Sequence, residues 1–245
     1  MRKAAASAIP ADIVSADMNV EKEALTWVVM AGNIGSGKTS LTQLLSQRLG
    51  WQAFYESVDN NPYLADFYAD MRIWAFHLQM YFLGNRAHEI EYMIETGEAA
   101  LMDRSIYEDA HIFVRALHEM DNLSERDFQA YTKLYSLVLD KLQKPSLLVY
   151  LDAPVSTLVD RIQKRARSIE DSIDPNYLRL LDSFYKQWIP TYSESPLLTI
   201  NSENYDFVNN LEHLEEIIKA VDYCIKTRKN LVLNAPGNFS YDFAK

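Results

Sequence analysis

The sequence predicts an α/β protein of three layers, in which helices cover both faces of a central parallel sheet. Three observations support this prediction. Short apolar runs alternate with helix-like segments through most of the chain. The clearest run, SLLVYLD, has the length and composition of a buried strand. Several of these runs end in polar side chains, which is typical of parallel sheets that bind a ligand at the carboxyl ends of their strands.

Each element has its own local signal. The expected strands lie at 27–31 (WVVMA), just before Glu56, within 99–105 (AALMDRS), at 146–152 (SLLVYLD) and at 197–200 (LLTI). The expected helices lie at 38–49, 71–96, 106–118, 124–142, 155–165, 175–188 and 207–227. Gly97 ends the long second helix, and Pro145 separates a helix from the clearest strand.

The 245 residues are enough for one large α/β domain, and 48% hydrophobic with 24% charged residues is an ordinary globular composition. We expect a flexible extension at 1–26 and one domain at 27–228. The remaining residues, 229–245, form a tail that either covers an edge of the sheet or is mobile.

The charge and cysteine content limit the partners. A net charge of −10 argues against nucleic acid or an anionic membrane as the main partner. The sequence contains no run of 18 apolar residues, so it predicts no transmembrane helix. A single cysteine, Cys224, cannot form an internal disulfide and indicates a reducing compartment. We therefore expect a cytoplasmic protein, with a mitochondrial one as the weaker alternative because Arg2, Lys3 and alanines open the chain.

A phosphate-binding loop follows the first strand. The segment GNIGSGKT has the Walker A spacing between a strand and a helix. Its residues are Gly32, Asn33, Ile34, Gly35, Ser36, Gly37, Lys38 and Thr39. The glycines let backbone N–H groups surround phosphates, Lys38 can reach the β- and γ-phosphates, and the Thr39 hydroxyl can bind Mg²⁺. The loop predicts ATP or GTP binding in a P-loop fold.

The loop alone does not separate a kinase from an ATPase or a GTP switch. No Asn-Lys-x-Asp motif for guanine occurs, which disfavours the switch. A kinase needs an acid or base for the acceptor hydroxyl and cations for the transferred charge. Glu56 ends the second strand, and Asp103 with Arg104 ends the third. Spacing leaves open whether Glu56 or Asp103 is the general base, and Asp103 could also hold Mg²⁺.

A cluster of cations follows the fourth strand. It consists of Arg161, Lys164, Arg165 and Arg167, four cations in seven residues of an acidic protein. Arg161 and Arg165 are four residues apart and share a helical face. Guanidinium groups stabilise charge on a transferred phosphoryl group, so this segment is interpreted as an arginine-rich lid that contacts ATP.

Five segments together resemble the deoxynucleoside kinase family. They are GNIGSGKT at 32–39, YES at 55–57, FHLQMYFLGNR at 76–86, DRSIYED at 103–109 and RARSIED at 165–171. The match looks like the bacterial deoxyadenosine/deoxyguanosine kinase branch, which is related to deoxycytidine kinase and mitochondrial thymidine kinase. It implies a homodimer that uses ATP and Mg²⁺ to phosphorylate the 5′-hydroxyl of a deoxynucleoside in nucleotide salvage. Deoxyadenosine is the leading substrate, with deoxyguanosine and deoxycytidine as alternatives.

The resemblance also assigns roles near the sugar. It places Glu56 beside the 5′-hydroxyl as the base and Asp103 near Mg²⁺. Tyr68 and Glu170 match residues that bind the 3′-hydroxyl, and Phe76 with Tyr68 would crowd the sugar and select the 2′-deoxy form. The family often has two adjacent acids where this chain has Ile169 and Glu170, so one acidic contribution is missing.

The same resemblance places Gln79, Arg86 and Asp109 at the base of the nucleoside. Gln79 and Arg86 are seven residues apart and share a helical face, and Asp109 is expected to pair with Arg86. Two other functions fit the sequence less well. A nucleoside monophosphate kinase would need more arginines between 56 and 90 than Arg72 and Arg86. A non-catalytic nucleotide-binding regulator would tend to lose the base or the lid.

Overall fold

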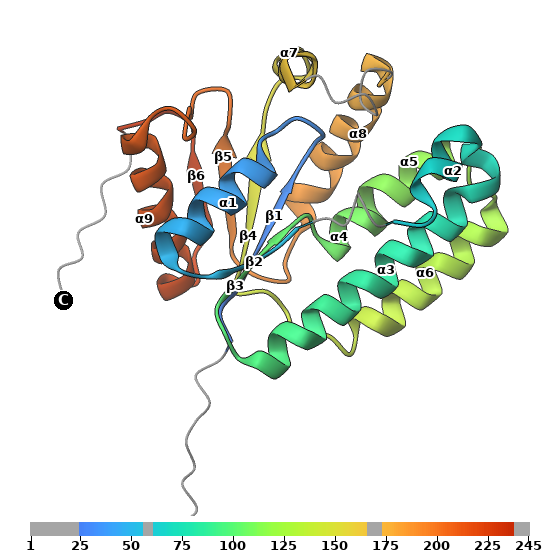
Figure 1. Cartoon of the computed structure of the whole chain (residues 1–245), viewed down its shortest axis with the longest axis horizontal. Helices are drawn as coiled ribbons and strands as arrows, with labels where there is room; N and C mark the ends of the chain where they lie inside the picture. Colours follow the sequence, from blue (N-terminus) through green and yellow to red (C-terminus); the bar gives the residue numbers. More distant parts are fainter. Residues whose placement is uncertain (1–24, 56–60, 166–172, 238–245) are drawn as a thin grey trace, which may run out of the picture.

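The computed structural model describes residues 25–55, 61–165 and 173–237. A six-stranded sheet in the order β2-β3-β1-β4-β5-β6 forms its centre, and every neighbouring pair of strands is parallel. Helices α1 and α9 lie on one side of this sheet, and α3, α6 and α8 lie on the other (Figure 1). The three-layer parallel architecture predicted from the sequence is confirmed.

The strands are short, as expected for a sheet that is buried on both faces. They are β1 (Trp27–Gly32), β2 (Gln52–Phe54), β3 (Ala100–Asp103), β4 (Leu147–Asp152), β5 (Leu197–Asn201) and β6 (Leu231–Leu233). The central strand β1 pairs with β3 on one side and with β4 on the other. The strand order therefore reverses at β1, with β2 and β3 on one side and β4, β5 and β6 on the other. Parallel sheets of this kind bind ligands at the carboxyl ends of the strands where the order reverses.

The helices follow the predicted order with several additions. They are α1 (Lys38–Leu49), α2 (Leu64–Ala69), α3 (Met71–Thr96), α4 (Ile106–Glu108), α5 (Arg115–Glu119), α6 (Glu125–Leu139), α7 (Val155–Arg165), α8 (Pro175–Trp188) and α9 (Leu211–Thr227). A π-helical segment η1 (Asp109–Val114) joins α4 to α5, and a 3₁₀ turn η2 (Ile189–Thr191) follows α8.

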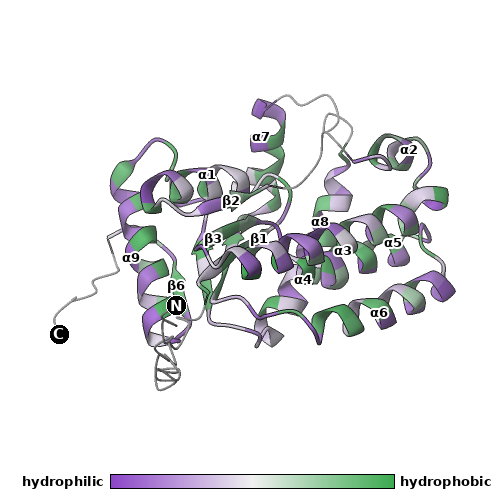
Figure 2. Cartoon of the chain, turned by 60° about the horizontal axis from the view of Figure 1, so that its bottom comes forward, coloured by the Kyte–Doolittle hydropathy of each residue, from purple (hydrophilic) through white to green (hydrophobic). Residues whose placement is uncertain are grey.

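Alternation along β1 divides the core into two layers. Trp27, Val29 and Ala31 pack with α3, α6 and α8, whereas Val28 and Met30 pack with α1 and α9. All five side chains are buried because each face of a strand meets a helical layer. The long helices carry hydrophobic and hydrophilic residues in alternation, as expected for helices with one face on the sheet (Figure 2).

Some predicted bounds were wrong. The last helix begins at Leu211 rather than 207, because the Asn210 side chain caps it by accepting a hydrogen bond from the Glu212 N–H at 2.9 Å. The predicted helix over 106–118 is interrupted by the π-helical segment η1. Helix α2 was not predicted, and α6 ends at Leu139 rather than 142.

Part of the C-terminal tail belongs to the sheet. Strand β6 pairs with β5 in parallel, so Leu231–Leu233 covers the edge that β5 would otherwise present. Among the residues placed in the structure, no helix is both long enough and apolar enough to span a bilayer.

Candidate active site

The phosphate loop connects β1 to α1 at the carboxyl edge of the sheet. Its first glycine, Gly32, has φ +147°, and a Cβ atom there would lie 2.7 Å from the Leu151 carbonyl oxygen and 2.6 Å from Ser36 Oγ. Gly37 immediately precedes α1 with φ +103°. A side chain at either position would strain the backbone or collide with it, so glycine is required for this loop to close around an anion.

The lysine of the loop is held by backbone oxygens. Lys38 is 6% exposed, and its Nζ donates to the Gly32 carbonyl at 2.6 Å and to the Asn33 carbonyl at 3.0 Å. The ammonium therefore lies inside the curve of the loop. A positive charge there, together with the N-terminus of α1, favours a bound phosphate group.

The middle of the loop is anchored to the helices beyond it. The Asn33 side chain donates to the Leu178 carbonyl of α8 at 3.0 Å and accepts from the Ile34 N–H at 2.8 Å. Ile34 packs beside Leu158 and Ile162 of α7. The Asn33 side chain thus holds the loop against α8.

Thr39 and Asp103 bring the loop and β3 together. The Thr39 hydroxyl donates to Asp103 Oδ2 at 2.6 Å, because Asp103 ends the strand that pairs directly with β1. A hydroxyl and a carboxylate in contact are the hard oxygen ligands that Mg²⁺ takes, usually beside water and phosphate oxygens. No group of three or more His, Cys, Asp and Glu side chains is placed to bind a metal within the described residues.

Arg104 lies next to this pair in an unusual backbone conformation. It has φ +80°, which is rare for a residue with a side chain. Its guanidinium carbon lies 4.5 Å from the centre of the Phe113 ring, and Nη1 lies 4.0 Å from Oε1 of Glu108. The turn after β3 therefore fixes both the acid and the arginine of the DRS motif at the end of the sheet.

Glu108 was missed as a functional candidate in the sequence. It is fully buried, and its Oε1 accepts from the Gly32 N–H at 2.9 Å. The Ser-x-x-Glu pattern at 105–108 signals a capping box, which the structure contains. That local pattern predicts the hydrogen bonds to Ser105 but gives no sign of the contact with a loop 76 residues away.

The predicted pairing of Arg86 with Asp109 is confirmed. Nε of Arg86 donates to Oδ2 of Asp109 at 2.5 Å, and both side chains are buried. Burial raises the pKa of the Tyr131 hydroxyl, the negative charge of Asp109 raises it further, and the positive charge of Arg86 lowers it. The ion pair thus joins α3 to η1 below the DRS turn.

Gln79 comes from the same long helix as Arg86. It is 4% exposed, and its Oε1 has no hydrogen-bond partner within the described residues. A buried amide oxygen without a partner costs free energy. It is therefore suited to accept a hydrogen bond from a ligand.

Tyr68 and Phe76 lie where α2 and α3 meet. Tyr68 is 45% exposed and contacts the Phe67 ring, and Phe76 is half-buried against the core. Burial raises the pKa of Tyr177 on α8, the proximity of Tyr68 raises it further, and Arg104 lowers it.

The lid arginines are only partly described. Arg161 on α7 donates to the Ser36 carbonyl and to Ser202 Oγ, each at 3.2 Å, and to the Ser202 carbonyl at 2.5 Å. Burial lowers the pKa of Arg161, which Glu203 and Asp206 partly oppose. Arg161 therefore joins the phosphate loop to the end of β5, and Arg165 ends the helix.

Three predicted site residues, Glu56, Arg167 and Glu170, lie outside the described residues. Of the others, the structure brings the phosphate loop, Asp103 and Arg104 together at the end of the sheet. It places Gln79 and the Arg86–Asp109 pair in the helical layer beside them.

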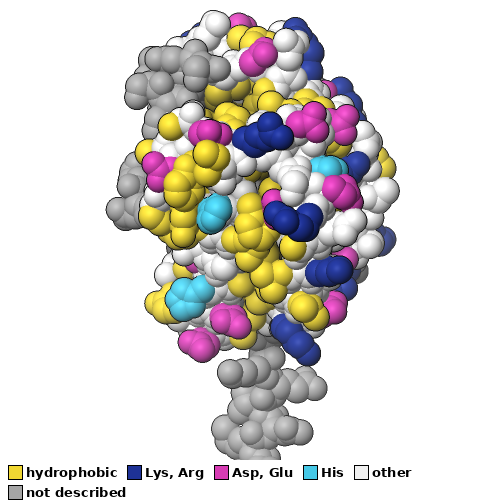
Figure 3. All heavy atoms as spheres, turned by 90° about the vertical axis from the view of Figure 1, so that its right-hand side faces the viewer, with side chains coloured by type: hydrophobic (Ala, Val, Ile, Leu, Met, Phe, Trp, Pro, Cys, Tyr) yellow, Lys and Arg dark blue, Asp and Glu magenta, His cyan; other side chains and the backbone are white. Residues whose placement is uncertain are grey.

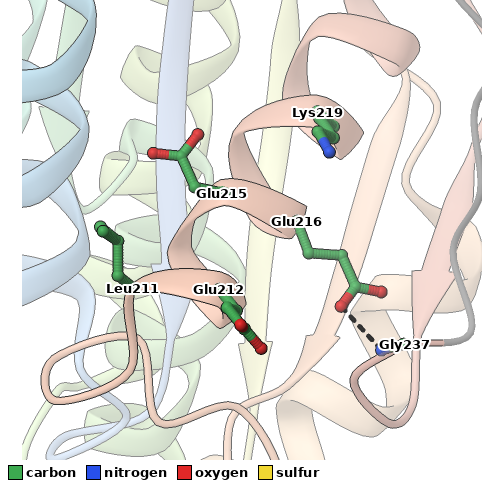
Figure 4. Close-up of a pocket in the computed structure, with 6 residues that line it drawn as sticks. All are labelled: Leu211, Glu212, Glu215, Glu216, Lys219 and Gly237. Atoms are coloured by element: carbon green, nitrogen blue, oxygen red, sulfur yellow. Dashed lines mark hydrogen bonds between the residues drawn. The ribbon is translucent and has the colours of Figure 1, made fainter.

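A separate hollow of about 350 Å³ lies on α9, away from the phosphate loop. It is lined by Leu211, Glu212, Glu215, Glu216, Lys219 and Gly237. Glu216 accepts a hydrogen bond there from the Gly237 N–H at 2.9 Å (Figure 4). This contact anchors the chain after β6, and the acidic lining differs from that of a phosphate site.

The fold and the loop define an α/β kinase of the P-loop class. The deoxynucleoside kinase family model matches residues 28–226. Deoxyadenosine kinase of Lactobacillus acidophilus is 37% identical over 214 residues, covering 83% of this chain and 98% of that protein. Deoxyadenosine/deoxycytidine kinase of Bacillus subtilis is 35% identical over 196 residues, covering 79% and 90%. The chain therefore belongs to the deoxynucleoside kinase family.

Solved structures agree with this placement. Deoxyadenosine kinase from M. mycoides with bound dATP superposes with a TM-score of 0.71 at 26% identity, covering 80% of this chain and all of that one. The same enzyme with the products dCMP and a flexible dCDP bound gives a TM-score of 0.70 at 27% identity, covering 81% and 100%. The protein is an enzyme of nucleoside phosphorylation.

Proposed function

We propose that this enzyme transfers the γ-phosphoryl group of ATP to the 5′-hydroxyl of a deoxynucleoside, with deoxyadenosine preferred. The observation that carries the proposal is the contact of Thr39 with Asp103 at 2.6 Å. It joins the phosphate loop to the strand end that carries Arg104. A phosphoryl donor on the loop and an acceptor beside Arg104 would therefore meet at one point of the sheet.

The nucleotide site is supported by the loop geometry. Backbone N–H groups, Lys38 and the N-terminus of α1 would bind the phosphates, and Arg161 with Arg165 and Arg167 would supply cations from the lid side. Thr39 and Asp103 would hold Mg²⁺, which supplies charge neutralisation between the β- and γ-phosphates. Phosphoryl transfer depends mainly on such positioning and charge stabilisation.

We assign proton acceptance to Glu56 and metal binding to Asp103. The Oδ2 atom of Asp103 accepts from the Thr39 hydroxyl, at the start of the helix that follows the phosphate loop. An acid in that place is better suited to a cation than to the acceptor hydroxyl. Arg104 would orient the acceptor oxygen, and Tyr68 with Glu170 would bind the 3′-hydroxyl.

Base selection would depend on Gln79 and the Arg86–Asp109 pair. An amide offers one donor group and one acceptor, which fits the amino group and adjacent ring nitrogen of adenine or cytosine. The buried Oε1 of Gln79 is suited to that amino group. The C5-methyl group of thymine would meet the charged pair, so purines and deoxycytidine should be favoured over thymidine.

The relatives support this range of substrates. Kinases named for deoxyadenosine, for deoxyadenosine with deoxycytidine and for deoxyguanosine all match this chain at 35–39% identity. We further propose a cytoplasmic homodimer. Hydrophobic side chains are exposed on the helical layer, among them Leu134 and Leu137 of α6. Figure 3 shows hydrophobic side chains gathered between charged ones on one side of the molecule.

An ATP-coupled assay with the four deoxynucleosides tests the proposal. We expect kcat/KM to be highest for deoxyadenosine and lowest for thymidine. Replacing Arg86 and Asp109 together by Met and Ala should raise relative thymidine activity, because the charged obstacle is removed. Asp109→Ala alone should lower kcat/KM for all four deoxynucleosides, because it leaves the buried guanidinium of Arg86 without its carboxylate. Equal wild-type activity on thymidine and deoxyadenosine would contradict this account of the pocket.

A further inference from the structure

The first glycine of the phosphate loop is held on both sides of its backbone. The N–H of Gly32 donates to Oε1 of Glu108 at 2.9 Å. Its carbonyl oxygen accepts from the Tyr185 hydroxyl at 2.8 Å and from Nζ of Lys38 at 2.6 Å. Glu108 comes from α4 and Tyr185 from α8, so two elements far apart in the chain meet at this one residue.

The Glu108 carboxylate is used more fully than a helix cap requires. Its Oε2 accepts from the Ser105 N–H at 2.9 Å, and the Ser105 Oγ accepts from the Glu108 N–H at 3.0 Å, which completes the capping box. The same Oε2 also lies 3.2 Å from Ser105 Oγ. Its Oε1 accepts from Gly32 and from the Tyr185 hydroxyl at 2.5 Å. A cap needs only the first of these oxygens. Burying a charge is costly, so the second oxygen and its full set of donors point to a further role.

The same carboxylate faces the arginine of the DRS motif. Nη1 of Arg104 lies 4.0 Å from Oε1 of Glu108, on the oxygen that also contacts the phosphate loop. The guanidinium is held from its face by the Phe113 ring. A shift of Glu108 would therefore change the loop and the position of Arg104 together.

The Tyr185 hydroxyl has one proton and two acceptors. Burial raises its pKa, and the negative charge of Glu108 raises it further, so the group stays protonated. It lies 2.5 Å from Oε1 of Glu108 and 2.8 Å from the Gly32 carbonyl oxygen. Only one of these oxygens can receive the proton at a time. While Lys38 donates to the Gly32 carbonyl, the Tyr185 proton can go to Glu108.

We propose that Glu108 and Tyr185 are positioning residues that hold the phosphate loop in place relative to Arg104. Tyr185 has the additional task of bonding the Gly32 carbonyl when Lys38 turns from it to the phosphates of the nucleotide. This inference rests on the proposed function, because it takes the loop as the ATP site. The turn breaks the Tyr185 bond to Oε1 of Glu108, but that oxygen keeps the Gly32 N–H as a donor. Among the described residues, the Gly32 carbonyl would have no side-chain donor without the tyrosine once Lys38 has moved. Because a buried polar group left without a partner costs more than one that loses one of two partners, the turn lowers the cost of nucleotide binding.

Removing the hydroxyl alone tests the second task. In Tyr185→Phe we expect the Kd for ATP, measured by calorimetry, to rise about tenfold, since one hydrogen bond to a buried group is lost when Lys38 moves. The KM for deoxyadenosine should stay within about twofold, because the ring still fills its place. The matched control is Tyr192→Phe, which removes a partly buried hydroxyl that contacts Ser195, outside the residues assigned to the site.

Changing the carboxylate tests the first task. Glu108→Gln keeps one acceptor oxygen, but it turns an amide N–H₂ toward donors of the other oxygen and removes the negative charge that faces Arg104. We expect it to lower kcat and to weaken ATP binding. Combined with Tyr185→Phe it should weaken ATP binding by less than the product of the two single effects, since the residues act on one carbonyl and one carboxylate. Circular dichroism and the Tm show which variants are folded. If Glu108→Gln does not fold, Tyr185→Phe decides.

The inference is wrong if Tyr185→Phe binds ATP as Tyr192→Phe does while its Tm falls equally, because the hydroxyl would then be purely structural. Its failure is distinguishable from failure of the proposed function. If Lys38→Ala still transfers phosphate at a normal rate, the assignment of the loop as the ATP site is wrong. Loss of transfer in Lys38→Ala, with unchanged ATP affinity in Tyr185→Phe, would contradict only the positioning role of Glu108 and Tyr185.

Discussion

At the residue scale, the ammonium group of Lys38 is held in position by its own loop before a nucleotide binds. Its ammonium contacts two carbonyl oxygens of its own loop, at 2.6 and 3.0 Å, instead of lying in solvent. Neutral carbonyl oxygens bind an ammonium less strongly than phosphate oxygens do. The lysine is thus held near its place of action by contacts that a phosphate can replace.

Lys38→Ala should lower kcat by roughly a thousandfold, because phosphoryl transfer depends on compensating charge on the β- and γ-phosphates. The measurement is the steady-state rate with ATP and deoxyadenosine. Lys133→Ala, at an exposed position on α6, is the control and should keep the wild-type rate. Turnover of Lys38→Ala within a few-fold of wild type would contradict the assignment of the loop.

The two acids should separate by the kind of defect they cause. Glu56→Gln should keep ATP binding and lower kcat by roughly 10² to 10⁴, the usual contribution of a positioned proton acceptor. Asp103→Asn should raise the Mg²⁺ concentration needed for half-maximal rate, because it replaces the carboxylate next to Thr39 by a neutral amide, which binds Mg²⁺ less strongly. Titrating Mg²⁺ for both variants checks this. If Asp103→Asn loses kcat with normal Mg²⁺ dependence and Glu56→Gln does not, the two roles are reversed.

At the scale of elements, α7 is docked onto the phosphate loop by one side chain. Arg161 contacts the Ser36 carbonyl of the loop and Ser202 after β5. Two parts of the carboxyl edge of the sheet are thereby joined through a helix that leads into the predicted lid. The contacts of Arg161 with Ser36 and Ser202 thus fix the position of α7 relative to the phosphate loop.

Arg161→Gln should therefore raise the KM for ATP about fivefold to tenfold, since a shorter neutral side chain loses these bonds. The KM for the deoxynucleoside should change less, because Arg161 contacts Ser36 of the phosphate loop and Ser202 rather than the residues proposed to bind the nucleoside. Asp160→Asn, exposed on the same helix, provides the control. Equal ATP KM values for the two variants would show that Arg161 has no part in nucleotide binding.

At the scale of the whole molecule, the helical layer opposite α1 and α9 is the expected dimer surface. Leu137 on α6 is 64% exposed, and a second copy of the chain would remove such apolar area from water. Light scattering at micromolar concentration should give a dimer mass. Leu137→Glu should shift the protein toward the monomer, whereas Val208→Glu, exposed elsewhere, should not. A monomer mass for the wild type would end this proposal.

Much of the fold was predictable because its signals are local. The apolar run at 27–31, the Walker A glycines and Gly97 each constrain the backbone within a few residues. The structure accordingly has β1, α1 and the end of α3 where the sequence placed them. The start of α9 was wrong by four residues, because the choice of Asn210 as its cap depends on packing.

The sequence by itself determined the layered parallel sheet and the phosphate loop, since periodicity and glycine spacing are properties of short segments. The pairing of Arg86 with Asp109 was implied by the family resemblance of the motifs that carry them. Only the tertiary structure decided that Glu108 reaches Gly32 and that Tyr185 meets both, across 76 and 153 residues. It also decided that β6 closes the edge of the sheet. Such contacts form when packed elements bring distant side chains together, and no local pattern records which buried carboxylate will face which loop.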